Sequence, residues 1–426
     1  MPRARRSART RATCATCARS SASSLPKRSS TALAVLAACF LLNMFGRGLG
    51  DTYAVFLLPL EREFGWSRSQ LTSVYSIYLL VNGFTAPFVG LMFDRLGPRW
   101  VYGAGMASLG AAMLLAGGLT QLWQFYLFIG VLVGVGVSLN GMVPASALLA
   151  RWYRERLTTA IGIAYSAFGV GTVLFVPLVQ FLVGEYGWRA GYRLLGGALL
   201  ALAPLVMLGI PWKTFAVGGP RTEGTPRAGE GWSLAAALRS PVFWGLVQVF
   251  FFTAAGMFSI VVQLVAFFVD AGFSPLVAAT AFGIVGLLSA ASVMGSGLAA
   301  ERFGYRQTVT ASFCGTATGM ALLYLLTLDP SALLLILFVP VFGLCMGVRG
   351  PIISSVCARY FAGPRVATIY GLIYASNALG AAFGAYLGGL LHDITGGYRA
   401  GLGLALASIA LAALPFWIVP TLRHFR

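Results

Sequence analysis

The chain has 426 residues, of which 58% are hydrophobic and only 10% are charged, whereas soluble proteins carry about 25% charged residues. So few charged groups cannot cover a soluble fold of this length, and most of the surface must therefore face lipid. The net charge of +18 does not indicate a nucleic-acid partner, because most basic residues lie between long apolar segments and do not cluster on a polar face.

Residues 1–30 form a basic tail that holds eight of the 30 basic residues and no acidic residue. Its composition resembles a transit peptide, and residues 31–45 could pass for the apolar part of a signal peptide. Removal of the first apolar segment would leave an odd number of spans. We therefore expect a disordered tail near anionic lipid head groups, or a start of translation placed too early.

A bilayer-spanning helix needs about 20 apolar residues, and cuts at charged or turn-rich breaks give twelve such segments. The expected spans in the first half of the chain are 32–59, 68–92, 99–119, 122–149, 157–183 and 190–212. Those in the second half are 236–268, 275–299, 307–327, 331–357, 365–391 and 397–420. The sequence therefore predicts an all-α membrane protein with twelve transmembrane helices.

The basic residues of the loops predict the orientation of these spans. With the N-terminus inside the cell, 23 basic residues lie on the cytoplasmic side and 5 on the opposite side. This bias follows the positive-inside rule, so we expect both termini in the cytoplasm and the protein in the cell (inner or plasma) membrane. The polar stretch 213–235 is predicted to be a cytoplasmic linker between bundles 31–212 and 236–422, and 423–426 a cytoplasmic end.

The two halves contain the same short motifs at nearly constant separation. Gly187-Trp-Arg-Ala-Gly191 matches Gly397-Tyr-Arg-Ala-Gly401, and Ala150-Arg-Trp-Tyr153 matches Ala358-Arg-Tyr-Phe361. The run Gly90-Leu-Met-Phe-Asp94-Arg95-Leu-Gly97-Pro-Arg99 matches Gly297-Leu-Ala-Ala-Glu301-Arg302-Phe-Gly304-Tyr-Arg306. Three matches in the same order indicate an internal duplication, which is typical of transporters whose halves rock against each other.

The GxxxDRxGxR loop, its repeat and the twelve spans resemble the major facilitator superfamily over residues 32–420. That resemblance implies two pseudo-symmetric six-helix bundles, and it implies that the loop cluster latches the halves when the cavity faces outward. The residues carrying this role would be Gly90, Asp94, Arg95, Gly97 and Arg99, with Glu301, Arg302 and Arg306 in the second copy. These charges could instead serve only to fix the topology.

A second resemblance is carried by Pro59-Leu-Glu-Arg-Glu-Phe-Gly-Trp-Ser67 and Gly187-Trp188-Arg189. This resemblance is to the monocarboxylate transporter and oxalate–formate antiporter branch. It implies a secondary transporter of a small organic anion. The chain departs from the branch at the eighth span, 275–299, which lacks the usual substrate-binding arginine. The helix 5 motif of proton-coupled drug exporters is also missing.

Three ionisable residues lie inside expected spans, where a charge costs about 2.5 kcal/mol or more and therefore indicates function. They are Arg47 and Asp51 in the first span and Arg349 in the tenth. Both arginines could hold a substrate carboxylate through two parallel hydrogen bonds. Alternatively, Arg47 and Asp51 neutralise each other at i,i+4 spacing, or Arg349 bonds to backbone carbonyls. Asp51 could also couple transport to protons.

Polar residues on the expected cavity helices are weaker candidates for substrate contact, namely Asn140, Tyr165, Gln263, Tyr374 and Asn377. No catalytic motif or ATP-binding loop occurs, so we expect a protein that is not an enzyme and binds no cofactor or metal. An ion or solute gradient would then drive transport, by symport or exchange. We also expect a monomer. Two alternatives remain: an exporter of hydrophobic or cationic compounds, and a non-transporting membrane sensor of the same fold.

Overall fold

The computed structural model describes residues 25–153, 157–217, 232–361 and 366–423. These residues form helices joined by short turns, and no strand occurs among them. Helices are expected of such an apolar chain, because a helix satisfies its backbone hydrogen bonds within the segment that lipid surrounds. Serine side chains cap several helix starts, including α4, α12 and α14, and proline occupies the first position of α12 and α14.

The helices of the first half are α2 (Leu25–Asp51), α3 (Tyr53–Phe64), α4 (Arg68–Leu96), α5 (Pro98–Ala116), α6 (Leu122–Phe125), η1 (Tyr126–Val133, a π-helix), α7 (Gly134–Asn140), α8 (Met142–Trp152), α9 (Leu157–Gly209) and α10 (Trp212–Val217). Those of the second half are α11 (Leu234–Leu238), α12 (Pro241–Val261), α13 (Leu264–Asp270), α14 (Pro275–Phe303), α15 (Tyr305–Leu326), α16 (Ala332–Met346), α17 (Arg349–Tyr360), α18 (Val366–Thr395), α19 (Arg399–Ala413), α20 (Pro415–Ile418) and α21 (Pro420–Arg423).

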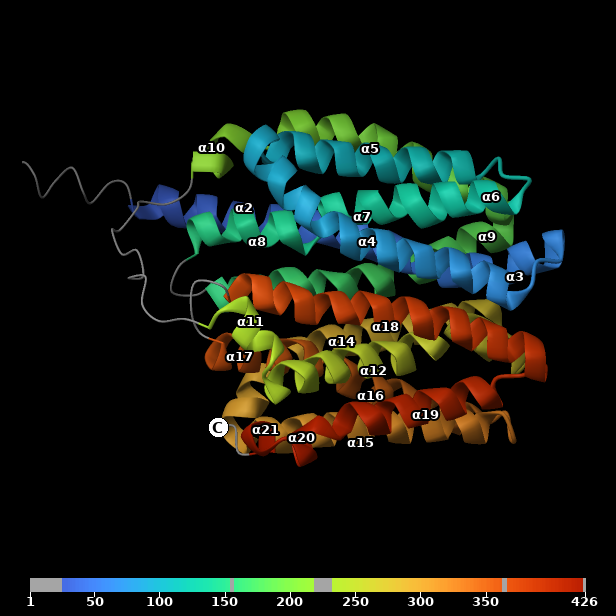
Figure 1. Cartoon of the computed structure of the whole chain (residues 1–426). Helices are drawn as coiled ribbons and strands as arrows, with labels where there is room; N and C mark the ends of the chain where they lie inside the picture. Colours follow the sequence, from blue (N-terminus) through green and yellow to red (C-terminus); the bar gives the residue numbers. More distant parts are fainter. Residues whose placement is uncertain (1–24, 154–156, 218–231, 362–365, 424–426) are drawn as a thin grey trace, which may run out of the picture.

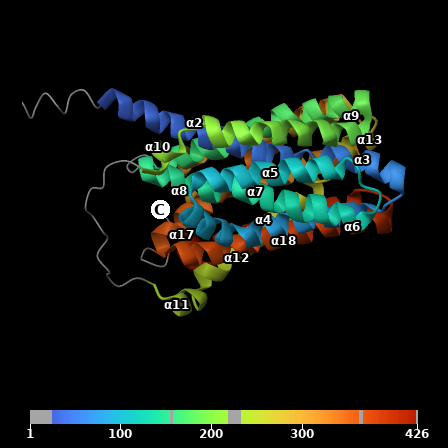
Figure 2. The same cartoon turned by 90° about the horizontal axis from the view of Figure 1, so that it is seen from above.

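The long helices run side by side in two stacked groups (Figure 1). Helices α2 to α10 form the upper group and α11 to α21 the lower one, and the view from above shows the same lengthwise alignment (Figure 2). We call the end with the turns 64–68, 270–275 and 395–399 the distal end, at the right of Figure 1. The opposite, proximal end carries α10, α11 and α21.

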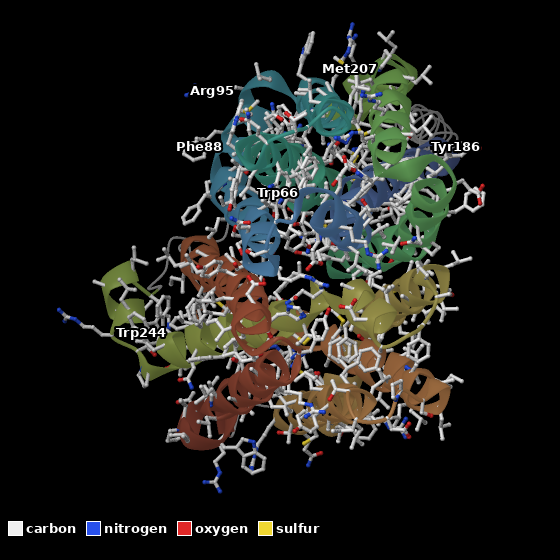
Figure 3. All side chains as sticks on the ribbon, turned by 90° about the vertical axis from the view of Figure 1, so that its right-hand side faces the viewer. Trp66, Phe88, Arg95, Tyr186, Met207 and Trp244 are labelled. Carbon is white, nitrogen blue, oxygen red and sulfur yellow. The ribbon has the colours of Figure 1, made fainter. Side chains whose placement is uncertain are left out.

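Nine helical segments of the described residues are long and apolar enough to cross a membrane. One of them, Thr159–Gly209, contains two of the expected spans and bends at Gly187. Phe88 and Tyr186 project away from the bundle and are 65% and 64% exposed (Figure 3). Large apolar side chains on this outer surface fit contact with lipid. The chain is a multi-pass membrane protein, while the count of twelve spans stays a prediction.

The expected tail 1–30 and linker 213–235 lie partly outside the described residues. Residues 1–24 and 218–231 are not described, and neither are 424–426 of the expected C-terminal end. Both ends of the linker region are helical, in α10 and α11, where the sequence predicts only irregular chain. Trp212 stacks on Tyr102 of the first half, and Trp232 packs against Phe361 of the second. The ends of this region are therefore anchored on different halves.

The internal duplication extends to backbone conformation. All six positive-φ residues of the described chain are glycines, and they form three pairs 207, 207 and 209 residues apart. The pairs are Gly65 with Gly272, Gly97 with Gly304, and Gly187 with Gly396. Each pair lies at the same turn of the two halves, where a side chain would be strained. The second pair forms the turn inside each copy of the repeated motif.

Glycines allow close helix packing both within and between the halves. Gly380, Gly384 and Gly388 of α18 face backbone carbonyls of α12, so a Cβ at any of them would clash. Between the halves, α9 packs on α14 where Gly169 meets Gly286, and α4 packs on α18. The two groups of helices therefore touch along α9/α14 and α4/α18, where small residues let the backbones approach.

Charged residues join the two halves at the distal end, in a cluster that we call the distal clamp (Glu61, Arg68, Asp270, Asp393 and Tyr398). Arg68, at the start of α4, is 4% exposed. Its guanidinium contacts Glu61 at 2.6 Å and Asp270 of the second half at 3.0 Å. The Tyr398 hydroxyl donates to Asp270 at 2.6 Å and accepts from Arg68 at 2.9 Å.

The carboxylate of Asp393 completes the distal clamp. Its two oxygens accept the backbone N–H groups of Arg68 and Ser69, at 2.9 and 2.8 Å. These groups open the first turn of α4, where backbone donors lack partners within the helix. A side chain of the second half therefore caps a helix of the first, which closes the distal end.

Candidate substrate site between the two halves

A cavity of about 200 Å³ lies between the halves. Residues of α2, α3, α4 and α9 line it on one side, and residues of α12, α14 and α16 line it on the other. The first group includes Arg47, Asp51 and Tyr165 of the predicted site. A concave, mostly apolar space with a few convergent polar groups is the usual form of a small-molecule site.

An ion pair forms the charged part of this cavity. Arg47 Nε lies 3.3 Å from Asp51 Oδ1, and the two side chains are 23% and 18% exposed. The residues are one helical turn apart on α2, so the regular helix places both on one face, as their spacing predicts. The two charges cancel, so the pair is neutral overall. Asp51 contacts only part of the guanidinium, and the other N–H groups of Arg47 can donate to a second anion.

Two hydroxyl groups from other helices contact the Asp51 carboxylate. Tyr75 of α4 donates to Oδ1 at 3.4 Å, and Thr172 of α9 lies 3.2 Å from Oδ2. The Thr172 hydroxyl also lies 2.9 Å from the Phe168 carbonyl one turn earlier, and it has a single proton to donate. Asp51 is thus held by α2, α4 and α9 at once, which fixes its position in the cavity.

Two helices present regular faces to the cavity. On α9 the lining positions are Tyr165, Phe168, Gly169 and Thr172, and on α14 they are Phe282, Val285, Gly286, Ser289, Ala290 and Val293. Both sets follow the i, i+3, i+4, i+7 pattern of one helical face. Sequence reasoning found Tyr165 but missed the rest, although its helical register marks Thr172 as a neighbour.

None of the other predicted polar residues lines this cavity. Tyr374 of α18, in the other half, is 44% exposed, and its ring packs edge-on against Phe250. Asn140 and Gln263 are buried, and each side-chain amide donates to the carbonyl four residues earlier in the chain. Neither lines this cavity, and neither does Asn377, which is partly exposed.

Arg349 is 1% exposed and lies inside the second half. Its guanidinium sits 4.9 Å from the centre of the Phe313 ring, and Nη2 is 3.4 Å from the Met346 carbonyl. Nε and Nη1 have no hydrogen-bond partner among the described residues. Arg349 does not line the cavity, although its neighbour Met346 does. The two arginines expected to face one substrate are therefore not brought together in this conformation.

The repeated loop motif lies at the proximal end. Gly97 and Gly304 form its turns with φ of 80° and 84°. The Arg99 guanidinium lies 5.7 Å from the Trp100 ring, and that of Arg306 lies 3.8 Å from the Trp417 ring. Arg95 is exposed and Gly90 has room beside it, while the Asp94 and Glu301 side chains lie outside the described residues. The latch role of these residues stays a prediction.

Comparisons with known proteins show which family the chain belongs to. The family profile described as Major Facilitator Superfamily matches residues 36–337 and 289–425. Monocarboxylate transporter 13 of Rattus norvegicus is 28% identical over 394 residues, which cover 92% of this chain and 89% of that protein. Monocarboxylate transporter 3 of Mus musculus is 30% identical over 382 residues, covering 89% and 77%.

A third relative, monocarboxylate transporter 4 of Gallus gallus, is 27% identical over 401 residues, covering 91% of this chain and 83% of that protein. The similarity thus spans both halves of the fold and the cavity between them. These relatives are transporters, not enzymes. The chain belongs to the major facilitator superfamily, and within it resembles the monocarboxylate transporters.

Proposed function

We propose that this protein is a secondary active transporter that moves a small, monocarboxylate-like organic anion together with a proton by alternating access. In this proposal two six-helix bundles, 31–212 and 236–422, rock about the cavity, with the linker and both termini in the cytoplasm. The protein acts as a monomer in the cell membrane. Ion or solute gradients supply the energy, because the halves themselves carry no ATP-binding loop.

The observation that carries the proposal is the Arg47–Asp51 ion pair inside the cavity. Breaking this partly buried pair leaves one charge without compensation, which is unfavourable. Protonation of Asp51 removes its negative charge, and a substrate carboxylate then replaces it beside Arg47. The site stays neutral before and after loading, so proton and anion bind together. The same cycle run with anion at both faces gives exchange.

Tyr165 would flank the bound anion, and Tyr374, Arg349, Asn140, Gln263 and Asn377 would contribute in conformations in which their helices turn toward the cavity. The proximal latch of Asp94, Arg95 and Arg99, with its copy at Glu301, Arg302 and Arg306, would hold the halves together when the distal end opens. Charges there would pair with helix ends of the opposite half. The distal clamp would hold the halves together when the proximal end opens.

The proposal is tested by uptake of labelled monocarboxylates into proteoliposomes with an inward proton gradient. We expect the parent protein to accumulate the acid, and Arg47→Ala to lose uptake while it still inserts normally. Arg47→Lys keeps the charge without the planar donor pair, so partial uptake is expected. Absence of any carboxylate flux by the parent protein would refute the proposal and favour a non-transporting sensor.

Asp51→Asn separates the two coupling modes. Asparagine mimics the protonated carboxyl in shape but cannot release a proton, so we expect loss of proton-driven uptake with exchange of labelled for unlabelled acid retained. Uptake that still follows the proton gradient in this variant would exclude Asp51 as the proton site. Export of organic cations is disfavoured because Arg47, Tyr75 and Thr172 already surround the one acidic side chain among the lining residues.

A further inference from the structure

We infer that the site selects monocarboxylates with a bulky apolar body, of the size of an aromatic ring, over short acids and dicarboxylates. The inference rests on the proposed function and narrows its substrate class. It comes from an asymmetry of the cavity: the first half supplies the charged groups, and the second half supplies an almost entirely apolar wall.

The charged end of the cavity belongs to the first half alone. Arg47 and Asp51 come from α2, and the hydroxyls of Tyr75 and Thr172 approach them from α4 and α9. A carboxylate therefore binds here, where guanidinium N–H groups can donate to it.

The wall supplied by the second half has one polar side chain, Ser289, among its lining residues. Its other members are the rings of Phe258 and Phe282, with Val261, Val262, Val285, Val293 and Met346, and the small residues Gly286 and Ala290. Phe168 of the first half adds a third phenylalanine to the cavity lining. Binding is favoured when aromatic and branched side chains of this kind cover apolar substrate surface and so remove it from water.

The cavity volume sets the size of the apolar body. An engineered apolar cavity of about 150 Å³ binds benzene, so about 200 Å³ accommodates a ring that carries a short carboxylate arm. A two-carbon acid would leave most of the apolar wall without contact. Each further buried methylene tightens binding about fourfold, so affinity should rise steeply from acetate to acids with a ring.

The charges of the lining exclude a second carboxylate on the substrate. Arg47 is the one cation among the lining residues, and a single substrate carboxylate already compensates it once Asp51 is protonated. A dicarboxylate bound through Arg47 would place its other charge against Phe258, Phe282 or their neighbours. An ionised group there has no partner, and its burial is strongly unfavourable. Affinity for dicarboxylates should therefore fall well below that for a monocarboxylate of equal length.

The test is competition for uptake of labelled phenylacetate into proteoliposomes that contain the full chain. We expect unlabelled phenylacetate and 3-phenylpropionate to compete at concentrations at least tenfold lower than acetate, and succinate to compete more weakly than butyrate. Equal potency of acetate and phenylacetate, or stronger competition by succinate, would overturn the inference while leaving carboxylate transport intact. If no carboxylate is taken up or competes, the proposed function itself fails.

Substitutions in the apolar wall test which residues cause the preference for phenylacetate over acetate. Phe282→Ala should weaken phenylacetate at least tenfold and leave acetate nearly unchanged, whereas Phe282→Leu, which keeps the core filled, should reverse much of the loss. Phe88→Ala removes the same ring from the outer surface and is the matched control, with no expected change in selectivity. An unchanged ratio of phenylacetate to acetate affinity in Phe282→Ala would contradict the assignment.

Discussion

Replacement of Asp393 by asparagine should loosen the distal clamp in a measurable way. Asp393 accepts two backbone N–H groups through separate oxygens, at 2.9 and 2.8 Å. Asparagine keeps one acceptor oxygen and turns an NH₂ group toward the other N–H, so one charge-assisted hydrogen bond is lost. We expect a cost of about 1–2 kcal/mol, which changes the equilibrium between the closed and open distal end by a factor of about 5–30.

Hydrogen exchange measured by mass spectrometry reports this change directly. The amides of Arg68 and Ser69 begin α4 and are protected by Asp393 across the interface, so a peptide covering 66–72 should exchange faster in Asp393→Asn. Asp329→Asn is the matched control, because Asp329 is an exposed acid in the turn between α15 and α16 at the same end. Equal exchange rates in the Asp393 variant and the parent would refute this account of the clamp.

The pH dependence of the clamp has a defined sign. Asp393 lies in the last turn of α18, beyond the expected span 365–391. Burial there raises the pKa of its carboxyl, but hydrogen bonds from Ser69 and Arg68 outweigh burial and hold the pKa below its ordinary value of 3.8. The carboxylate therefore stabilises the closed distal end above that value, and the contribution is lost only as pH falls through the lowered pKa. Exchange in 66–72 should stay constant between pH 7 and 8, after correction for intrinsic rates, because burial lowers the pKa of the neighbouring His392 from 6.5 and its imidazole is neutral there.

Three further substitutions, one of them with a control variant, have expected outcomes. Gly384→Leu places a side chain against the Ala255 carbonyl and should lower stability by about 1–3 kcal/mol in thermal unfolding, whereas Gly403→Ala, with open space around it, should not lower stability. Gly97→Ala imposes a side chain on a φ of 80° and should cost about 1–3 kcal/mol; unchanged thermal stability would show that the turn relaxes. Glu63→Gln breaks a 2.9 Å ion pair with Arg189 that is partly exposed, and the amide oxygen can still accept from the Trp188 indole N–H, so its effect on unfolding should stay below about 1 kcal/mol.

Several features of the fold follow from local sequence and could therefore be predicted. Long apolar segments require helices in lipid, and the repeated motifs indicate two related halves. The turn at Gly97 and the ion pair between Arg47 and Asp51 depend on neighbours a few residues away, and both are present. The helical segments at the ends of the linker region were missed, because short helices carry too few periodic positions to be recognised.

The membrane environment limits what the sequence says about the site. In a soluble protein the apolar face of a helix marks the core, but here the faces toward lipid and toward the interior are both apolar. The sequence therefore does not show that α14 turns Phe282 toward the cavity, or that Thr172 reaches Asp51. It also does not show that Arg349 lies against Phe313, away from the cavity lining.

The low content of charge and the arrangement of the apolar segments determined by themselves that this is a helical, duplicated membrane protein, because these properties depend only on neighbouring residues and on the solvent. Only the tertiary structure decided which of its few charges meet. Arg68, a loop charge in sequence terms, joins Asp270 and Asp393 from the other half, 202 and 325 residues away. Such contacts depend on how each helix is rotated and packed, and many side chains together determine that rotation.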